Sequence, residues 1–560
     1  MTKFAQKTIY QVYPKSFYDT TGDGTGDIPG ITAKLDYLQK LGIEMIWLNP
    51  FYPSPQNDNG YDIADYTAVD PLFGTMDDVT TLIKEAKKRN IGIMIDLVLN
   101  HTSTEHPWFK KALAGDPFYR DFYYFRPAKA DGSPPTNWVS KFGGNAWEKL
   151  PDSSEYYLHL YDVTQADLDW ANPNVREALF DVVNFWIDKG VEGFRLDVLN
   201  VIAKPKFLED DFEGDGRRFY TDGPGIHAYL KELHERTFGD KPIITVGEMS
   251  STDIDNCIRY SNPDEKELSM VFHFHHLKVD YPDGEKWRLA DVNFENLKSI
   301  FHTWQVAMSE ENGWDALFWN NHDQPRALGR FASDKPEHYY HSATLLGATI
   351  HFMRGTPFVY MGEEIGMMNP KFPTIDDYVD VETLNHFDIL QKNGLSEQEV
   401  MVIIKERSRD NSRTPMQWDD SQNAGFTTGT PWLKVADNAS EINVQAALSN
   451  KTSIFYFYQK LIALRKEYPV IQTGDYTPYW TDEDLIIAYK RSNEITSILS
   501  IHHFGSTTKK IQLPNEFLNA KVLLSNYERQ TISSELELAP YETLTLIRIK
   551  KSLRKNSQAF

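Results

Sequence analysis

Eight short apolar runs recur between residues 8 and 361, and their spacing limits the fold more than any other feature of this chain. Each run is followed by a polar residue and then by a helix-like or looping stretch. Residues 77–90 and 172–190, for example, have the apolar spacing of an amphipathic helix. Near-continuous apolar strands that alternate with such helices predict a parallel (β/α)₈ barrel. The runs are TIYQVY, IEMIWL, IGIMIDLVL, VEGFRLDV, PIITVGE, LSMVFHF, DALFWN and TPFVYM.

The main alternative is a doubly wound open α/β sheet. Dinucleotide-binding sheets of that kind carry a G-x-G-x-x-G turn after the first strand, and no such turn follows TIYQVY. The barrel is therefore the favoured α/β architecture, and we expect residues 1–100 and 172–478 to form it.

Two further domains are expected beside the barrel. Residues 101–171 separate the third and fourth runs by more than one helical crossover needs and are dense in aromatic residues, which predicts an inserted domain. Residues 479–560 change to short β-rich pieces between turn residues, which predicts a C-terminal antiparallel β-sandwich. The last residues, 550–560, are polar and basic and are expected to form a solvated tail.

The charge of the chain disfavours several classes of partner. The 58 Lys and Arg residues against 80 Asp and Glu residues give a net charge of −22, which opposes binding to nucleic acid or to an anionic membrane. An anionic ligand would need a local basic cluster. The single cysteine, Cys257, excludes an intramolecular disulfide, and residues 1–13 contain no apolar export segment, so we expect a cytoplasmic protein. No uninterrupted apolar stretch predicts a membrane span.

Acidic residues stand where several of the apolar runs end. In a (β/α)₈ barrel the active site lies at the carboxyl ends of the strands. Asp197 ends the fourth run, Glu248 ends the fifth, and Asp323 follows the seventh. We therefore expect these three carboxylates to converge on one pocket.

Two of these carboxylates suit retaining glycoside hydrolysis. Arg195 and Asp197 stand two residues apart on an expected strand, so both side chains point to one face, and the guanidinium should keep Asp197 ionised. Crowding by carboxylates should raise the pKa of Glu248, which suits a general acid. A nucleophilic carboxylate and a protonated one are the minimum for this reaction. Ion pairs at strand ends would explain any one of these residues, but not the whole set.

The chain resembles the α-amylase superfamily, glycoside hydrolase family 13. The resemblance rests on DLVLNH at 96–101, GFRLDV at 193–198, EM at 248–249 and NNHD at 320–323. QADLDW, GYDIADY, GTPFVYMGEE and RTPMQW reinforce it, and the similarity covers essentially the whole chain. It implies a (β/α)₈ barrel with a B domain inserted after the third strand, and a C-terminal β domain.

The resemblance also implies roles for individual residues. Asp197 matches the nucleophile, Glu248 the acid/base, and Asp323 the carboxylate that stabilises the transition state. In exo-acting α-glucosidases of the family, the residues that match Asp62 and Arg413 form a pair that binds the terminal glucose and closes the pocket behind it. No cofactor is implied for the chemistry. The other residues expected to bind the sugar are Tyr61, His101, Arg195 and His322.

The stretch DTTGDGTGD at 19–27 spaces oxygen ligands at every second residue. Its glycines allow a tight turn, and hard oxygen donors suit calcium. Gly30 stands where an EF-hand has its bidentate glutamate, so the loop is not an EF-hand. It is similar to the metal loop of oligo-1,6-glucosidases, which have Asn or Asp at the position of Thr21. A glycine-rich turn with solvated acids is the alternative to a structural Ca²⁺. The expected ligands are Asp19, Thr21, Asp23, Thr25 and Asp27.

Three stretches point to the substrate. Val198, directly after the nucleophile, resembles enzymes that act on linkages other than α-1,4, and residues 215–224 and 274–287 resemble family members that hydrolyse trehalose 6-phosphate. Lys278 and Lys286 flank a loop where the leaving sugar must lie, and a phosphate with close to two negative charges needs such a cluster. The favoured function is hydrolysis of this phosphorylated disaccharide to glucose and glucose 6-phosphate.

Three alternatives stay open at this point. An oligo-1,6-glucosidase or related α-glucosidase shares every catalytic residue and differs only beside the leaving sugar, where lysines are often merely solvated. A transglycosylase lets an acceptor sugar replace water. A non-enzymatic interaction protein, like the amylase-like ectodomains of amino-acid transporter heavy chains, is disfavoured because all three acids are retained.

Overall fold

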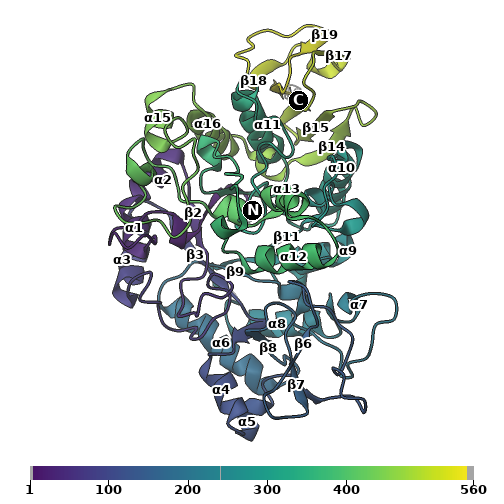
Figure 1. Cartoon of the computed structure of the whole chain (residues 1–560). Helices are drawn as coiled ribbons and strands as arrows, with labels where there is room; N and C mark the ends of the chain where they lie inside the picture. Colours follow the sequence, from purple (N-terminus) through teal and green to yellow (C-terminus); the bar gives the residue numbers. More distant parts are fainter. Residues whose placement is uncertain (1–3, 240, 551–560) are drawn as a thin grey trace.

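A computed structural model describes residues 4–239 and 241–550. Figure 1 shows a barrel at the centre, the segment inserted after its third strand below it, and the C-terminal sheet above it. Apart from Lys550, the predicted solvated tail lies outside the described residues. No helix within the described ranges is long and apolar enough to cross a membrane.

Eight parallel strands form the barrel, one for each predicted apolar run. They are β1 (Ile9–Val12), β2 (Met45–Leu48), β3 (Gly92–Leu97), β9 (Gly193–Leu196), β10 (Ile244–Glu248), β11 (Met270–Phe272), β12 (Ala316–Leu317) and β13 (Thr356–Tyr360). All their residues are buried, because one face points to the barrel interior and the other to the helices. β13 pairs with β1, and a parallel bridge between Val271 and Asp315 closes the sheet. The predicted barrel is confirmed, and the open sheet is excluded.

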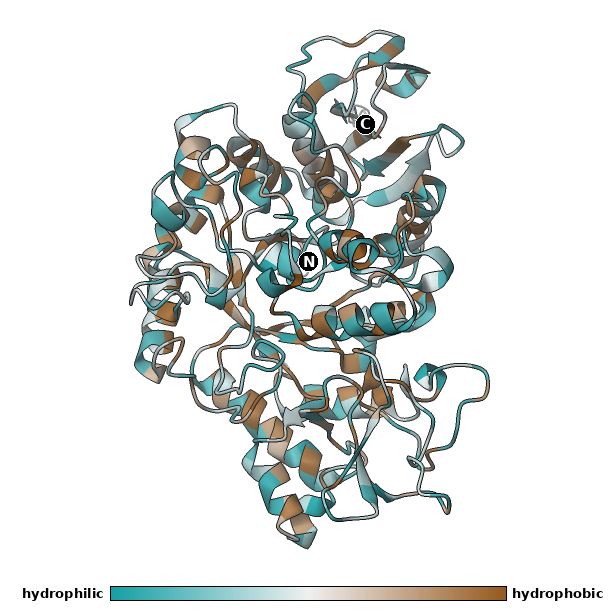
Figure 2. Cartoon of the chain, in the orientation of Figure 1, coloured by the Kyte–Doolittle hydropathy of each residue, from teal (hydrophilic) through white to brown (hydrophobic). Residues whose placement is uncertain are grey.

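Helices fill the connections between the strands. α3 (Met76–Lys88) and α6 (Pro173–Asp188) fall on the two predicted amphipathic segments. α3 begins with a capping box: Thr75 Oγ1 accepts from the Asp78 amide, and Asp78 Oδ2 accepts from the Thr75 amide. Figure 2 shows apolar barrel strands surrounded by helices of mixed polarity. The other helices around the barrel are α2 (Leu35–Leu41), α8 (Ile226–Arg236), α9 (Ile254–Ser261), α10 (Phe294–Glu310), α11 (Tyr339–His351) and α16 (Ile454–Glu467).

The chain between β3 and α6 forms the inserted domain. Its aromatic side chains build a core in which Trp138 and Trp147 pack with Val201 and Tyr220 from the segment after β9. The inserted domain is therefore anchored beside the strand that precedes Asp197. Its elements are β4 (His101–Ser103) paired with β8 (Gln165–Asp167), a sheet of β5 (Phe125–Pro127), β7 (Glu155–Leu158) and β6 (Trp147–Lys149), and helices α4 (Pro107–Leu113) and α5 (Pro117–Arg120).

The C-terminal domain is an antiparallel sandwich with its own apolar core, which includes Leu499, Phe517 and Leu546. This part of the fold prediction is confirmed, while the exact domain limits stay predictions. The five-stranded sheet has the order β14 (Asp475–Tyr479), β15 (Ile486–Ser492), β16 (Thr496–His503), β20 (Thr543–Ile549) and β18 (Lys521–Ser525), and the second sheet pairs β17 (Lys509–Gln512) with β19 (Glu535–Leu538).

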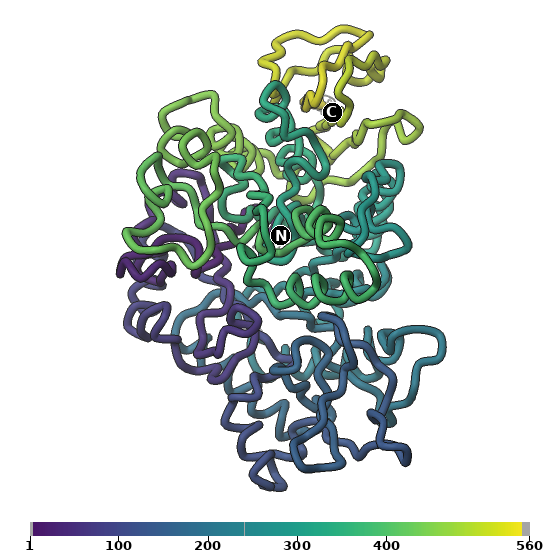
Figure 3. Tube along the Cα trace, in the orientation of Figure 1, coloured from purple at the N-terminus to yellow at the C-terminus, as the bar shows by residue number. Residues whose placement is uncertain are grey.

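The chain after β13 returns to the barrel and adds to its rim. Figure 3 shows the purple N-terminal segment beside the light green segment near residue 430, and Asp19 N donates to Phe426 O at 3.0 Å. Buried Trp287 shares a small core with Val400 and Ile404 from this region. The helices here are α12 (Val381–Lys392), α13 (Glu397–Arg407), α14 (Asp410–Arg413), α15 (Val444–Ser449) and α17 (Pro469–Thr473); α1 (Ile28–Ala33) and α7 (Arg217–Tyr220) lie earlier in the chain.

Candidate active site

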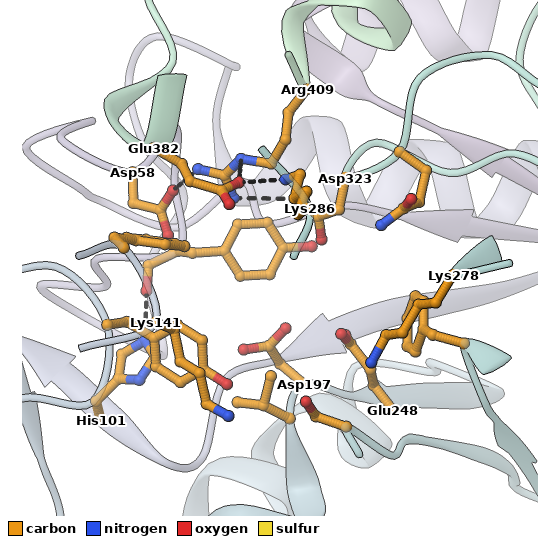
Figure 4. A pocket seen from close by; sticks show the side chains of 17 residues that line it. Asp58, His101, Lys141, Asp197, Glu248, Lys278, Lys286, Asp323, Glu382 and Arg409 are labelled. Carbon is orange, nitrogen blue, oxygen red and sulfur yellow. Dashed lines mark hydrogen bonds and ion pairs between the residues drawn. The ribbon is translucent and has the colours of Figure 1, made fainter. Parts of the chain in front are cut away.

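The carboxyl ends of the barrel strands surround a cavity of about 200 Å³. Asp197 directly follows β9, Glu248 is the last residue of β10, and Asp323 lies in the loop after β12. Figure 4 shows all three carboxylates directed into this cavity, as the sequence predicts. Four more of the predicted site residues line its wall: Tyr61, His101, Lys278 and Lys286.

Arg195 contacts three carboxylates from behind this wall. Its Nη1 donates to Asp96 Oδ1 and to Asp197 Oδ1, each at 2.7 Å, and its Nη2 contacts Glu248 Oε2. Asp197 and Glu248 therefore meet at the two ends of one guanidinium. Such closeness suits the separation of about 5–5.5 Å between the carboxyl groups of retaining glycosidases.

The protonation of Asp197 differs from the expectation. Burial raises the pKa of Asp197 to about 8, and the attraction of Arg195 offsets only part of that rise, with Asp96 and Asp323 adding to it. One guanidinium is too little to keep every adjoining carboxyl group ionised. The pair formed by Asp197 and Glu248 needs one proton for the chemistry, and that proton must reside on Glu248 when Asp197 attacks.

The backbone after the nucleophile is strained. Val198 has φ 37° and ψ 41°, a left-handed conformation that a β-branched residue rarely adopts. Such strain costs about 1–3 kcal/mol and persists only where the surroundings enforce it. Here Asp197 N donates to Leu97 O at 2.9 Å, and the Val198 side chain lines the cavity. The turn thus holds the Asp197 carboxylate at the end of β9.

His322 and Tyr61 support Asp323. His322 Nε2 lies 3.1 Å from Asp323 Oδ2, and Gln11 Nε2 donates to His322 Nδ1 at 2.9 Å. Burial lowers the pKa of His322 far below its usual value, so the ring is neutral at pH 7, and because Nδ1 accepts from Gln11 the ring proton is on Nε2, beside Asp323. The Tyr61 ring stacks on His322 with ring centres 5.2 Å apart. His101 is likewise neutral, because burial lowers its pKa to about 4.

The charged pair at the base of the pocket is Asp58 with Arg409, which corrects the predicted pair of Asp62 with Arg413. Arg409 Nη2 lies 3.0 Å from Asp58 Oδ1, and its Nη1 lies 3.3 Å from Asp323 Oδ1. Asp58 and Arg409 both line the cavity, whereas Asp62 and Arg413 do not.

Asp62 and Arg413 instead have supporting positions. Asp62 accepts from the Ser54 hydroxyl at 2.8 Å and from the Asn57 amide at 2.9 Å, so it holds the loop after β2. Arg413 Nη2 donates to Asp323 Oδ1 at 3.0 Å and its Nε to His322 O at 2.8 Å. Burial raises the pKa of Asp323, but His322, Arg409 and Arg413 lower it by more than that. Asp323 is therefore ionised at neutral pH.

Lys278 and Lys286, which are predicted to lie beside the leaving sugar, both line the cavity, but their environments differ. Lys286 Nζ forms an ion pair with Glu382 at 2.6 Å. Lys278 has no carboxylate within ion-pair distance among the described residues, and it is exposed to the cavity. Packing around its ammonium group lowers the pKa of Lys278 to about 8. Of these two lysines, only Lys278 therefore offers an uncompensated positive charge.

Sequence reasoning missed several residues of this wall. Arg409 precedes Arg413 by four residues and Asp58 precedes Asp62 by four, so helical and turn spacing could have suggested either member of each pair. Lys141, beside two glycines in the inserted domain, carried no recognisable pattern. The remaining unpredicted wall residues are Phe142, Tyr161, Ser250, Phe274, Gln324 and Glu382.

Protein groups in and around the loop of residues 19–27 donate hydrogen bonds to its carboxylates. Asp19 accepts hydrogen bonds from the amides of Gly22 and Gly24, at 2.8 and 2.9 Å, and Asp27 caps α1 by accepting from the Gly30 amide at 2.6 Å. Across residues 4–239 and 241–550, no group of three or more His, Cys, Asp or Glu side chains is arranged to hold a metal. Thr21, Asp23 and Thr25 add further oxygens, and calcium here stays a prediction.

Comparison with known proteins agrees with this geometry. Residues 11–474 match the alpha amylase catalytic domain family, and residues 486–544 match the alpha-amylase SusG C-terminal domain. The chain is 51% identical over 541 residues to a trehalose-6-phosphate hydrolase of Bacillus subtilis, with 96% of each protein covered. It is 45% identical to an oligo-1,6-glucosidase of Parageobacillus thermoglucosidasius, covering 96% of this chain and 97% of that protein.

The solved structures point the same way. A crystal structure of trehalose-6-phosphate hydrolase from Bacillus licheniformis superposes with a TM-score of 0.94 at 51% identity, covering 98% of this chain and 100% of that one. A trehalulose synthase reaches the same TM-score at 38% identity, covering 98% of this chain and 100% of that one. The barrel, the three carboxylates and these matches together show that the chain belongs to the α-amylase family.

Proposed function

We propose that this protein is a retaining glycoside hydrolase that cleaves trehalose 6-phosphate to glucose and glucose 6-phosphate. The observation that carries the proposal is one cavity that combines a catalytic carboxylate pair with lysines lacking an acidic partner on the leaving-group side. In a chain of net charge −22, uncompensated lysines at a sugar site indicate an anionic sugar. The similarity to proteins named trehalose-6-phosphate hydrolase supports the same substrate.

In the first step the terminal glucose occupies the space above Asp58 and Arg409. The Asp197 carboxylate attacks C1 of this glucose while Glu248 transfers its proton to the glycosidic oxygen. The C1–O bond to the leaving sugar breaks, and glucose 6-phosphate departs. Asp323, ionised beside Arg409 and Arg413, stabilises the positive charge that develops on the ring.

In the second step Glu248, now a carboxylate, removes a proton from water. The water oxygen forms a bond to C1, and the bond between C1 and the Asp197 oxygen breaks. Glucose leaves with its α configuration retained. Arg195 holds both carboxylates throughout, because each keeps a contact with one of its Nη groups.

A substrate panel tests this function. We expect kcat/KM for trehalose 6-phosphate to exceed that for trehalose and for isomaltose by at least about 100-fold, since two charge-assisted contacts to phosphate contribute about 1.5–3 kcal/mol each. Equal or faster cleavage of the unphosphorylated sugars would contradict the phosphate proposal. In that case the oligo-1,6-glucosidase alternative would hold, with the same catalytic residues.

We also propose a cytoplasmic location, because phosphorylated sugars are retained inside cells and the one cysteine, Cys257, is buried and forms no disulfide.

For the loop of residues 19–27 we propose weak structural calcium binding through Asp19 and Asp23. Calcium would replace hydrogen bonds that Asp19 already accepts, so chelation should lower Tm by only about 2 °C and added calcium should restore it. A Tm unaffected by either treatment would contradict the calcium proposal.

A further inference from the structure

Lys141 reaches the active site from the inserted domain. It lies in a tight hairpin, where Val139 bridges Asn145 and Gly143 has φ 92°. The Lys141 amide donates to Leu160 O at 2.8 Å, which fixes the hairpin to the strand segment behind it. Only the side chain is therefore free to respond to a ligand.

The charges around Lys141 are unusual. Its half-buried ammonium group packs over the Tyr220 ring, 5.3 Å from the ring centre, and faces the cations Arg217 and Lys278. Among the described residues, the acid whose charge raises the pKa of Lys141 is Asp215, and that carboxylate pairs with Arg217 at 2.9 Å. In the described part of the chain no carboxylate forms an ion pair with Lys141. Three cations thus lie close together, and the nearby acid Asp215 is already paired with one of them, Arg217.

These cations line two adjoining cavities, whose shared wall also contains Lys286, Gln324 and Glu382. A larger cavity of about 790 Å³, lined by Lys141, Arg217 and Lys278, adjoins the catalytic one. Lys141 and Lys278 line both cavities, so they stand at the boundary. In Figure 4 both side chains lie in the same half of the view as Asp197 and Glu248, while Lys286 lies opposite, against Glu382.

We propose that Lys141 is the residue through which the inserted domain selects a phosphorylated leaving sugar, and that it takes up a proton when the phosphate binds between Lys141 and Lys278. The inference rests on the proposed function and assigns its specificity. Burial, with Arg217 and Lys278, lowers the pKa of Lys141 to about 7, so about half of it is neutral at pH 7. A phosphate dianion replaces repulsion by attraction and favours the charged form.

The pH dependence of phosphate binding follows from the protonation of Lys141. Below pH 7 Lys141 is already charged in the free protein, and phosphate binding needs no proton. Above pH 7 each unit of pH makes proton uptake ten times less favourable, until the bound lysine also loses its proton. Above pH 7 the substrate phosphate is almost entirely a dianion, because its second pKa is about 6. Above pH 8 Lys278 adds a second decline for the same reason.

The experiment measures the ratio of kcat/KM for trehalose 6-phosphate to kcat/KM for p-nitrophenyl α-glucoside from pH 6 to 9. The ratio removes changes in the chemistry shared by both substrates. For the unaltered protein we expect the ratio to fall about fivefold between pH 7 and 8, because the charged fraction of Lys141 falls from about a half to about a tenth. Lys141→Arg, which stays charged, should delay the fall until about pH 8. Lys141→Gln should lower the ratio about 10- to 100-fold at pH 6.5 and flatten its course between pH 7 and 8.

Lys149→Gln provides the matched control, because Lys149 is an exposed lysine of the same inserted domain that lines neither cavity. It should leave the ratio unchanged at every pH. A ratio that is constant from pH 7 to 8, or a Lys141→Arg variant with the same decline as the unaltered protein, would overturn the proposal. If trehalose 6-phosphate showed no advantage at any pH, the proposed function itself would fail, which is a separate result.

Discussion

The two ends of the active-site pocket differ in how far their positive charges are balanced by acidic groups. At the base, Arg409 has several acidic partners: it lies 3.0 Å from Asp58, 3.3 Å from Asp323 and 2.6 Å from Asp380. At the mouth, Lys141 and Lys278 have no such partners among the residues described. The base is therefore a balanced network, and the mouth carries excess positive charge.

This difference indicates which part of a ligand fits where. Balanced charges present fixed hydrogen-bond donors and acceptors, which suit the hydroxyl groups of a neutral glucose. Excess positive charge in a partly desolvated cavity costs free energy until an anion arrives. The pocket is thus built for a disaccharide that is neutral at one end and anionic at the other.

Loss of the nucleophile should have the largest effect and should not distinguish the two ends. Asp197→Asn keeps the size of the side chain but removes its ability to attack C1, so kcat should fall on the order of 10⁴-fold for phosphorylated and unphosphorylated substrates alike. Steady-state kinetics on protein purified free of host glycosidases measures this. A fall of less than about tenfold would mean that another residue forms the covalent intermediate.

A change at the base should weaken every substrate equally. Asp58→Asn leaves Arg409 without one of its partners, and truncating one member of a buried charge pair costs about 2–5 kcal/mol, so we expect kcat/KM to fall about 100-fold on trehalose 6-phosphate and on p-nitrophenyl α-glucoside. Asp62→Asn is the matched control, because Asp62 holds the neighbouring loop without lining the cavity. The Asp62→Asn variant should have a lower Tm and a nearly unchanged KM. If Asp62→Asn impaired the kinetics more than Asp58→Asn, Asp62 would be the sugar ligand.

A change at the mouth should separate the substrates. Lys278→Gln removes a charge-assisted contact to phosphate worth about 1.5–3 kcal/mol, so the ratio of kcat/KM for trehalose 6-phosphate to that for p-nitrophenyl α-glucoside should fall about 10- to 100-fold. Lys278→Arg should recover part of the ratio, because it restores the charge. Equal losses on both substrates would make Lys278 a structural residue and remove the contrast between mouth and base.

The fold was predictable because it depends on periodicity. Eight buried strands leave eight apolar runs, and α3 and α6 show their buried faces in the spacing of apolar residues. The three carboxylates were predictable for a related reason, since each follows a strand end and such ends converge in a barrel. Both inferences use local order that any parallel barrel imposes.

The remaining site residues depend on how loops fold back, which local pattern does not encode. Asp58 and Asp62 stand in one loop, and only its turns decide which carboxylate faces Arg409. Lys141 comes from a hairpin that is more than 50 residues from Asp197 in sequence. The ionisation of Asp197 was misjudged for a similar reason, because one neighbour, Arg195, is visible in the motif while the burial that opposes it is not.

The smallest effect should come from Lys286, where the sequence could not reveal a neutralising partner. Lys286→Gln should lower the ratio of kcat/KM for trehalose 6-phosphate to that for p-nitrophenyl α-glucoside by no more than about fivefold. Lys286 is already paired with Glu382 at 2.6 Å, and such partly exposed pairs contribute about 0.2–1 kcal/mol. The loss arises mainly because Glu382 is left unpaired near the phosphate.

The double variant Lys286→Gln with Glu382→Gln separates these two causes. It removes both members of the pair and leaves the net charge of the mouth as it was, so the ratio should return to within about twofold of the unaltered protein. A double variant as impaired as Lys286→Gln alone would show that Lys286 binds phosphate directly. The excess charge at the mouth would then extend from Lys141 and Lys278 to a third lysine, with Glu382 displaced by the substrate.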